Sequence, residues 1–127
     1  MDSERGAFVT IGEEQYELIL TTRATKLIAQ RYGGMDKLGE QLLMLENTAE
    51  ALDEVVWLIV TLANQAIMAG NLKKQLPPRE LLTGEAVELL TTPTDLVDLK
   101  NAILDACVKG TVRTVESEPE GKNSDAG

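Results

Sequence analysis

The stretch that decides the fold is "ALDEVVWLIVTLANQAI", residues 51–67. Its apolar side chains recur at steps of three and four residues, which is the spacing of one face of an α-helix. That seam comprises Leu52, Val55, Ile59, Leu62, Ala66 and Ala69. Further apolar residues widen it until the middle of the stretch is apolar nearly all round, and a helix of that kind is buried on most sides. The stretch therefore predicts a central helix, over residues 48–69, around which the remaining elements pack.

The ends of this helix carry recognisable signals. Either Asn47 or Thr48 is placed to cap its first turn, and Glu50 would complete a capping box if Asn47 were the cap. Gly70 is the expected end.

Trp57 is the only tryptophan, and it stands among aliphatic residues of the same stretch. Its surroundings favour a core position, where truncation to alanine costs about 3–5 kcal/mol. The alternative is an exposed anchor for a partner, in which case the same truncation weakens binding and spares folding.

Upstream, residues 8–20 alternate around a "GEEQ" turn and predict a β-hairpin. The rhythm changes to a helical one at Thr21-Thr22, either of which can cap a helix over 22–32. Gly33 or Gly34 then ends that helix. A phosphate-binding interpretation of the glycines is disfavoured, because "GGMDKLGE" lacks the spacing of a phosphate loop and its acidic residues repel an anion.

Shorter helices are expected over 36–45, 84–90 and 93–109. For the last one, Thr92 or Thr94 is the cap, Pro93 begins the helix and Gly110 ends it. Residues 111–127 are rich in Glu, Ser, Gly and Pro and predict a disordered acidic tail, and residues 1–7 a flexible N-terminus. The predicted fold class is mainly α: a single domain, residues 8–110, forming a small helical bundle around a buried central helix, with an N-terminal β-hairpin.

Composition argues against several functions. The net charge is −9, from 21 acidic and 12 basic residues, and the basic residues are scattered, so nucleic-acid binding is not expected. The chain has no histidine, which removes the commonest general base and metal ligand. The single cysteine, Cys107, lies on the apolar stripe of the last helix and is expected to be a small core residue. Asp95 and Asp98 share one helix face, but acids are favourable near a helix start in any case. We therefore expect no enzyme, no cofactor and no metal.

Localisation follows from equally simple features. The N-terminus "MDSERGAF" has neither a basic nor an apolar signal region, and the apolar run Val55–Val60 is too short and too interrupted for a membrane span. A soluble cytoplasmic protein is expected.

The segment "NLKKQLPPRELL", residues 71–82, supplies the candidate partner-binding residues Leu72, Leu76, Leu81 and Leu82. Pro77-Pro78 forbids a continuous helix there. The four leucines either cover the end of the bundle or form an apolar loop for a partner.

The order of "VTIGEEQYELILTTRATKLIAQRYGG", "LGEQLL", "ALDEVVWLIVTLANQAI" and an acidic tail resembles the tail assembly chaperones of long-tailed bacteriophages and prophages, in particular those of low-GC Gram-positive hosts. The resemblance covers residues 9–110. It implies a small helical protein of the host cytoplasm that binds the tape measure protein, keeps it soluble while tail tube protein assembles around it, and is absent from the mature virion. Proteins of that class often have a longer form made by translational frameshifting, and this chain, with its short acidic end, would match the shorter product.

Two alternatives come from other classes: a structural head–tail joining or neck component of the virion, and an acidic inhibitor that mimics DNA. The second requires carboxylates arrayed at phosphate-like spacing, whereas here they are dispersed among caps and turns. The sequence leaves a homo-oligomer open.

Overall fold

The computed structural model describes residues 6–44, 46, 48–74 and 77–116. Two strands come first, β1 (Gly6–Ile11) and β2 (Glu14–Ile19), followed by the helices α1 (Thr22–Tyr32), α2 (Met35–Leu43) and α3 (Ala49–Lys73). The chain continues through α4 (Gly84–Leu90), a 3₁₀ turn at Pro93–Asp95 and α5 (Leu96–Glu116). The predicted class is confirmed: the protein is mainly helical, with an N-terminal hairpin.

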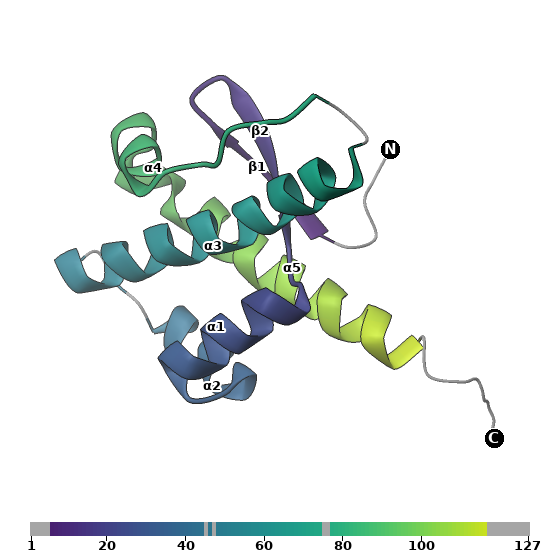
Figure 1. The fold of residues 1–127 in the computed structure, drawn as a ribbon. Helices are drawn as coiled ribbons and strands as arrows, with labels where there is room; N and C mark the ends of the chain where they lie inside the picture. Colours follow the sequence, from purple (N-terminus) through teal and green to yellow (C-terminus); the bar gives the residue numbers. More distant parts are fainter. Residues whose placement is uncertain (1–5, 45, 47, 75–76, 117–127) are drawn as a thin grey trace.

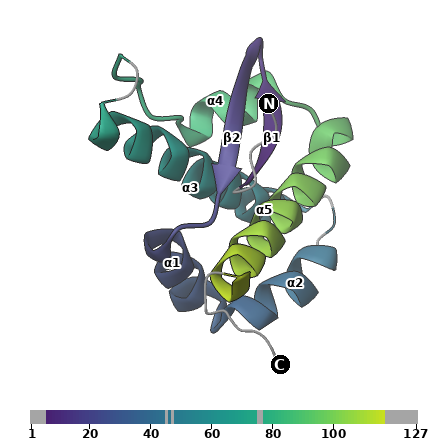
Figure 2. The same ribbon diagram turned by 90° about the vertical axis from the view of Figure 1, so that its right-hand side faces the viewer.

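The two long helices α3 and α5 cross beneath the hairpin, with α3 under β2 and α5 under β1 (Figures 1 and 2). The short helices α1 and α2 close one end of this arrangement, and α4 closes the other. The core lies where the hairpin meets α3 and α5. Its largest fully buried side chains are Ile11, Leu18, Ile28, Leu38, Leu42, Val55, Leu58, Ile59, Leu62, Val87 and Ile103.

The hairpin forms because one face of it is apolar. Ala7, Val9 and Ile11 are buried and alternate with exposed residues, so the inner face of β1 lies on the helices. Gly12 takes a φ of +65°, which the first residue of this two-residue turn requires. Pairing begins at Gly6 opposite Ile19, so the strand starts two residues before the predicted Phe8. The alternation already holds at Ala7, which the prediction had assigned to a flexible end.

Threonines begin the helices as predicted. The hydroxyl of Thr21 accepts from the amide of Ala24 at 3.1 Å, and the hydroxyl of Thr48 accepts from that of Ala51 at 3.1 Å. Gly33, with a φ of 87°, ends α1. The alternative cap Asn47 and the predicted helical residue Leu45 lie outside the described residues.

Two predicted helix ends are wrong. Gly70 lies inside α3, which continues to Lys73 and ends at Lys74 in the left-handed conformation, with a φ of 59°. Gly110 lies inside α5, which continues to Glu116, so residues 111–116 are helical instead of belonging to a tail. A Cβ at Gly110 would come within 2.7 Å of the Cβ of Leu20. Gly110 therefore permits close packing of α5 on the segment after β2, and it caps nothing.

Helix α3 is central, but it is not buried all round. Its inner face places Leu58, Ile59 and Leu62 in the core, while Val56, Trp57 and Val60 are only half-buried. Trp57 was predicted to be a core residue; it packs against the core but is only half-buried. Helix α3 has 25 residues and is, by length and composition alone, long and apolar enough to cross a membrane. This corrects the expectation, drawn from the shorter run Val55–Val60, that the stretch is too short for a membrane span. Core helices of soluble proteins pass the same test, and α3 packs its inner face on β2, α4 and α5.

Candidate partner-binding site

The four leucines predicted to bind a partner lie in different environments. Leu72 is on the last turn of α3 and is 83% exposed, and Leu81 is half exposed. Leu82 is 4% exposed and belongs to the core. Leu76 lies outside the described residues. Covering the bundle is therefore the role of Leu82, and Leu72 is the member most available to a partner.

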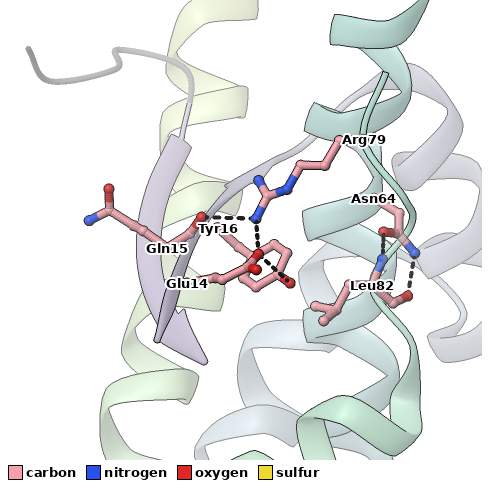
Figure 3. Close-up of polar contacts among 6 residues, drawn as sticks. All are labelled: Glu14, Gln15, Tyr16, Asn64, Arg79 and Leu82. Atoms are coloured by element: carbon pink, nitrogen blue, oxygen red, sulfur yellow. Dashed lines mark hydrogen bonds and ion pairs between the residues drawn. The ribbon is translucent and has the colours of Figure 1, made fainter. Parts of the chain in front are cut away.

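Residues 77–83, which we call the strap, run back along α3 toward α4 (Figures 1 and 3). Two asparagines of α3 hold its main chain. Asn64 donates to the carbonyl of Leu82 at 3.0 Å and accepts from the amide of Leu82 at 2.7 Å. Asn71 makes the same pair of hydrogen bonds with Arg79, both at 3.1 Å. Each asparagine thus satisfies a main-chain donor and acceptor that no regular structure pairs.

Arg79 ties the strap to the hairpin (Figure 3). Its guanidinium lies 4.3 Å from the ring centre of Tyr16, pairs with the carboxylate of Glu14 at 3.0 Å and donates to the carbonyl of Gln15 at 3.4 Å. The ion pair is exposed and contributes little by itself. Together with the asparagines it positions the strap, so that Leu82 enters the core and Leu81 stays at the surface.

Leu72 lines an open groove of about 680 Å³ where α1, α3 and α5 meet, which we call the three-helix groove. It is lined by Leu20, Thr21, Thr22, Arg23, Thr25, Met35, Gln65, Met68, Ala69, Leu72, Gly110 and Thr111. Five of these side chains are apolar, and two of the five are methionines. Methionine is unbranched and polarizable, so it adapts to differently shaped apolar surfaces. The groove is therefore suited to an apolar partner segment.

The floor of the three-helix groove is polar but satisfied. Gln65 is 5% exposed, and its amide donates to the carbonyl of Thr61 at 3.1 Å while its side-chain oxygen accepts from the hydroxyl of Thr21. Because Thr21 also caps α1, this contact fixes the start of α1 against α3. At the rim, the guanidinium of Arg23 lies 3.8 Å from the sulfur of Met68. The groove thus has a fixed floor and a more adaptable rim.

The other end of α1 is held by a cluster around Glu54. Arg31 donates to both carboxylate oxygens of Glu54, at 2.8 and 2.9 Å, and the hydroxyl of Tyr32 donates at 2.6 Å. The hydrogen bond from Arg31 lowers the pKa of Glu54, with a further contribution from Tyr32, although burial opposes the shift. Burial, followed by the nearby carboxylate, raises the pKa of Tyr32. These bonds hold the C-terminal end of α1 against α3, at the end of the helix away from the groove.

Trp57 belongs to this same cluster. The Arg31 guanidinium lies 4.4 Å from the Trp57 ring centre, and Tyr32 meets Trp57 edge-on with ring centres 6.4 Å apart. Its side chain therefore joins α1 to α3 and is neither central to the core nor free for a partner.

The acidic residues and the cysteine that the sequence offered as candidate metal ligands or reactive groups have structural roles. Within the described ranges, no three His, Cys, Asp or Glu side chains gather as a metal site requires. The carboxylate of Asp95 accepts from the amide of Thr92 at 2.8 Å and so caps the 3₁₀ turn that leads into α5. Burial raises the pKa of the Cys107 thiol to about 11, which leaves it protonated near neutrality.

The chain matches no protein-family model, no curated protein and no solved structure. The class defined by its fold is accordingly architectural: a mainly α protein with an N-terminal hairpin. Sequence patterns offered Leu72 as a candidate but did not predict the groove beside it, because Leu20, Met35 and Met68 come from three separate segments.

Proposed function

We propose that this protein is a phage tail assembly chaperone that binds the tape measure protein and keeps it soluble in the host cytoplasm. The observation that carries the proposal is the three-helix groove, an open groove with five apolar side chains, among which Leu72 is exposed at the surface of a folded protein. The resemblance of residues 9–110 to that class of chaperone supplies the identity of the partner. Recruitment of tail tube protein, and release before the virion is complete, belong to the same proposal.

The groove fits the chemistry of such a partner. A long helical protein that awaits assembly exposes apolar helix faces, and an amphipathic helix buries such a face by lying in an apolar groove. Leu72, Met68 and Met35 offer adaptable apolar contacts, so successive segments of different sequence can be accepted in turn. The net charge of −9 keeps the complex soluble.

Co-expression with the tape measure protein tests the proposal, with soluble partner and co-purification as the readouts. Leu72→Glu places a charge in the groove and is expected to abolish both. Leu89→Glu is the matched control, because Leu89 is a 73% exposed leucine on α4, which contributes nothing to the groove. If the unaltered protein does not keep the tape measure protein soluble, the proposal is contradicted. Recovery of this chain from purified mature particles would favour the head–tail joining alternative.

A further inference from the structure

A second surface is formed by the outer edge of β1. In a two-residue hairpin the pair that closes the turn exchanges both main-chain hydrogen bonds, and such pairs alternate with pairs whose main-chain groups point outward. Ile11 and Glu14 close this turn, so Phe8 and Thr10 direct their N–H and C=O groups away from β2.

Two contacts support this assignment of outward positions. On β2, Gln15 is paired with Thr10, and its carbonyl accepts from Arg79 of the strap. On β1, the carbonyl of Gly6 accepts from the ammonium of Lys109 at 2.9 Å. Lys109 thus closes one end of the β1 edge and the strap lies against the β2 edge. Within the described part of the chain the sheet has two strands only, so no third strand covers Phe8 and Thr10.

A groove of about 460 Å³ lies between this edge and α5, lined on the helix side by Asp98, Asn101, Ala102, Asp105 and Lys109 and on the strand side by Gly6, Ala7 and Phe8. The helix runs alongside β1 in Figure 2. A strand added at the edge would therefore lie above the stripe of α5 that carries Asp98 and Asp105. Asp105 pairs with Lys109 of its own helix at 3.4 Å, so Asp98 is the carboxylate that alternate residues of the added strand would face. The remaining residues would lie beside Phe8, which is 43% exposed.

We propose that the β1 edge binds an extended segment of another protein in which basic residues alternate with apolar ones. Main-chain hydrogen bonds to Phe8 and Thr10 give affinity, and Asp98 selects for Lys or Arg, because Asp105 is already paired with Lys109 at 3.4 Å. The edge accommodates roughly four residues at about 3.3 Å each. A second copy of this chain is a poor occupant, because its β1 strand, GAFVTI, has no basic residue to place opposite Asp98. This surface is separate from the three-helix groove, so the two proposals stand or fall independently.

The probe is a fluorescein-labelled, end-capped Lys-Val-Lys-Val-Lys-Val peptide, titrated with the full chain at low salt and followed by anisotropy. Saturable binding that weakens with salt is expected, and the Glu-Val-Glu-Val-Glu-Val peptide is expected not to bind. Absence of binding by the basic peptide would overturn the proposal.

Proline substitutions locate the site. Thr10→Pro removes an outward N–H without breaking a hydrogen bond inside the hairpin, and proline is tolerated on a strand edge. We expect binding at least tenfold weaker. Gln15→Pro makes the same change on the opposite edge and is expected to leave affinity unchanged. Equal losses from the two variants, or none from Thr10→Pro, would contradict edge pairing.

Two further measurements test whether a loss of binding comes from misfolding of the variant, and whether the charge of Asp98 contributes to binding. An N-methylated peptide probes the main-chain bonds with the protein unaltered, and it should lose affinity as Thr10→Pro does; retained affinity would exclude strand pairing. Asp98→Asn is expected to weaken binding about twofold to fivefold, whereas Glu85→Gln, an exposed first-turn acid of α4, should not. A wild-type dimer that Thr10→Pro converts to a monomer would identify a second copy as the occupant and overturn the proposal.

Discussion

Leu82→Ala and Leu72→Ala delete the same three carbon atoms in two opposite environments. Leu82 is 4% exposed and lies in the core, so its truncation leaves a cavity as well as losing burial. Truncating a buried leucine of this kind to alanine lowers the free energy of unfolding by about 2–5 kcal/mol. Asn64 bonds to the main chain of residue 82, and those hydrogen bonds survive the change, so the loss is one of packing alone. Leu72 is 83% exposed, and we expect its truncation to change stability by less than about 0.5 kcal/mol.

The assay is urea unfolding at equilibrium, followed by circular dichroism and by the fluorescence of Trp57, the only tryptophan. The free energy of unfolding of a whole protein is only about 5–15 kcal/mol. The urea midpoint of Leu82→Ala should therefore fall by a large fraction of the wild-type midpoint. The slope of the free energy of unfolding against urea concentration should stay unchanged, since the fold is retained. Similar midpoints for the two variants, or a larger loss from Leu72→Ala, would refute the placement of the strap.

Three further outcomes follow from the described contacts. The pKa of Glu54 is lowered in the folded state, so its contribution to stability is present above its pKa in the unfolded chain, about 4.3, and is lost as the pH falls below that value. Glu54→Gln should therefore destabilise the protein at pH 7, and the loss of stability should become progressively smaller in acid unfolding titrations. Cys107 should react with a thiol reagent at pH 8 only after urea is added, because burial keeps its thiol protonated, and rapid labelling of the native protein would count against this. Gly110→Ala should lower the thermal midpoint more than Gly39→Ala, since a Cβ meets Leu20 at the first position and nothing within 4 Å at the second; equal midpoints would argue against close packing there.

Local signals in the sequence were sufficient for most element boundaries. The ends of α1 were narrowed to Thr21 or Thr22 and to Gly33 or Gly34, because a cap hydroxyl and a left-handed glycine act within one turn of the chain; the structure uses Thr21 and Gly33. The same reasoning failed at Gly110, where the glycine serves a contact with Leu20, ninety residues away in sequence. It failed at Gly70 because Lys74 takes the left-handed conformation that was expected of a glycine.

The candidate site was only partly predictable for the same physical reason. The leucines of residues 71–82 could be recognised as apolar, but which of them is buried depends on Asn64 and Asn71 holding the strap from α3. Trp57 illustrates the converse. Its aliphatic neighbours suggested the core, whereas contacts with Arg31 and Tyr32 of another helix place it at the α1–α3 junction.

The central claim is that a partner helix occupies the three-helix groove. Cys107 is buried, so a cysteine introduced at Leu72 is a selective attachment point for a maleimide photo-crosslinker in the full chain. We expect Leu72→Cys, co-expressed with the tape measure protein, to give a crosslinked adduct of the two chains, and Leu89→Cys to give none. Crosslinking from position 89 but not from position 72 would contradict the claim.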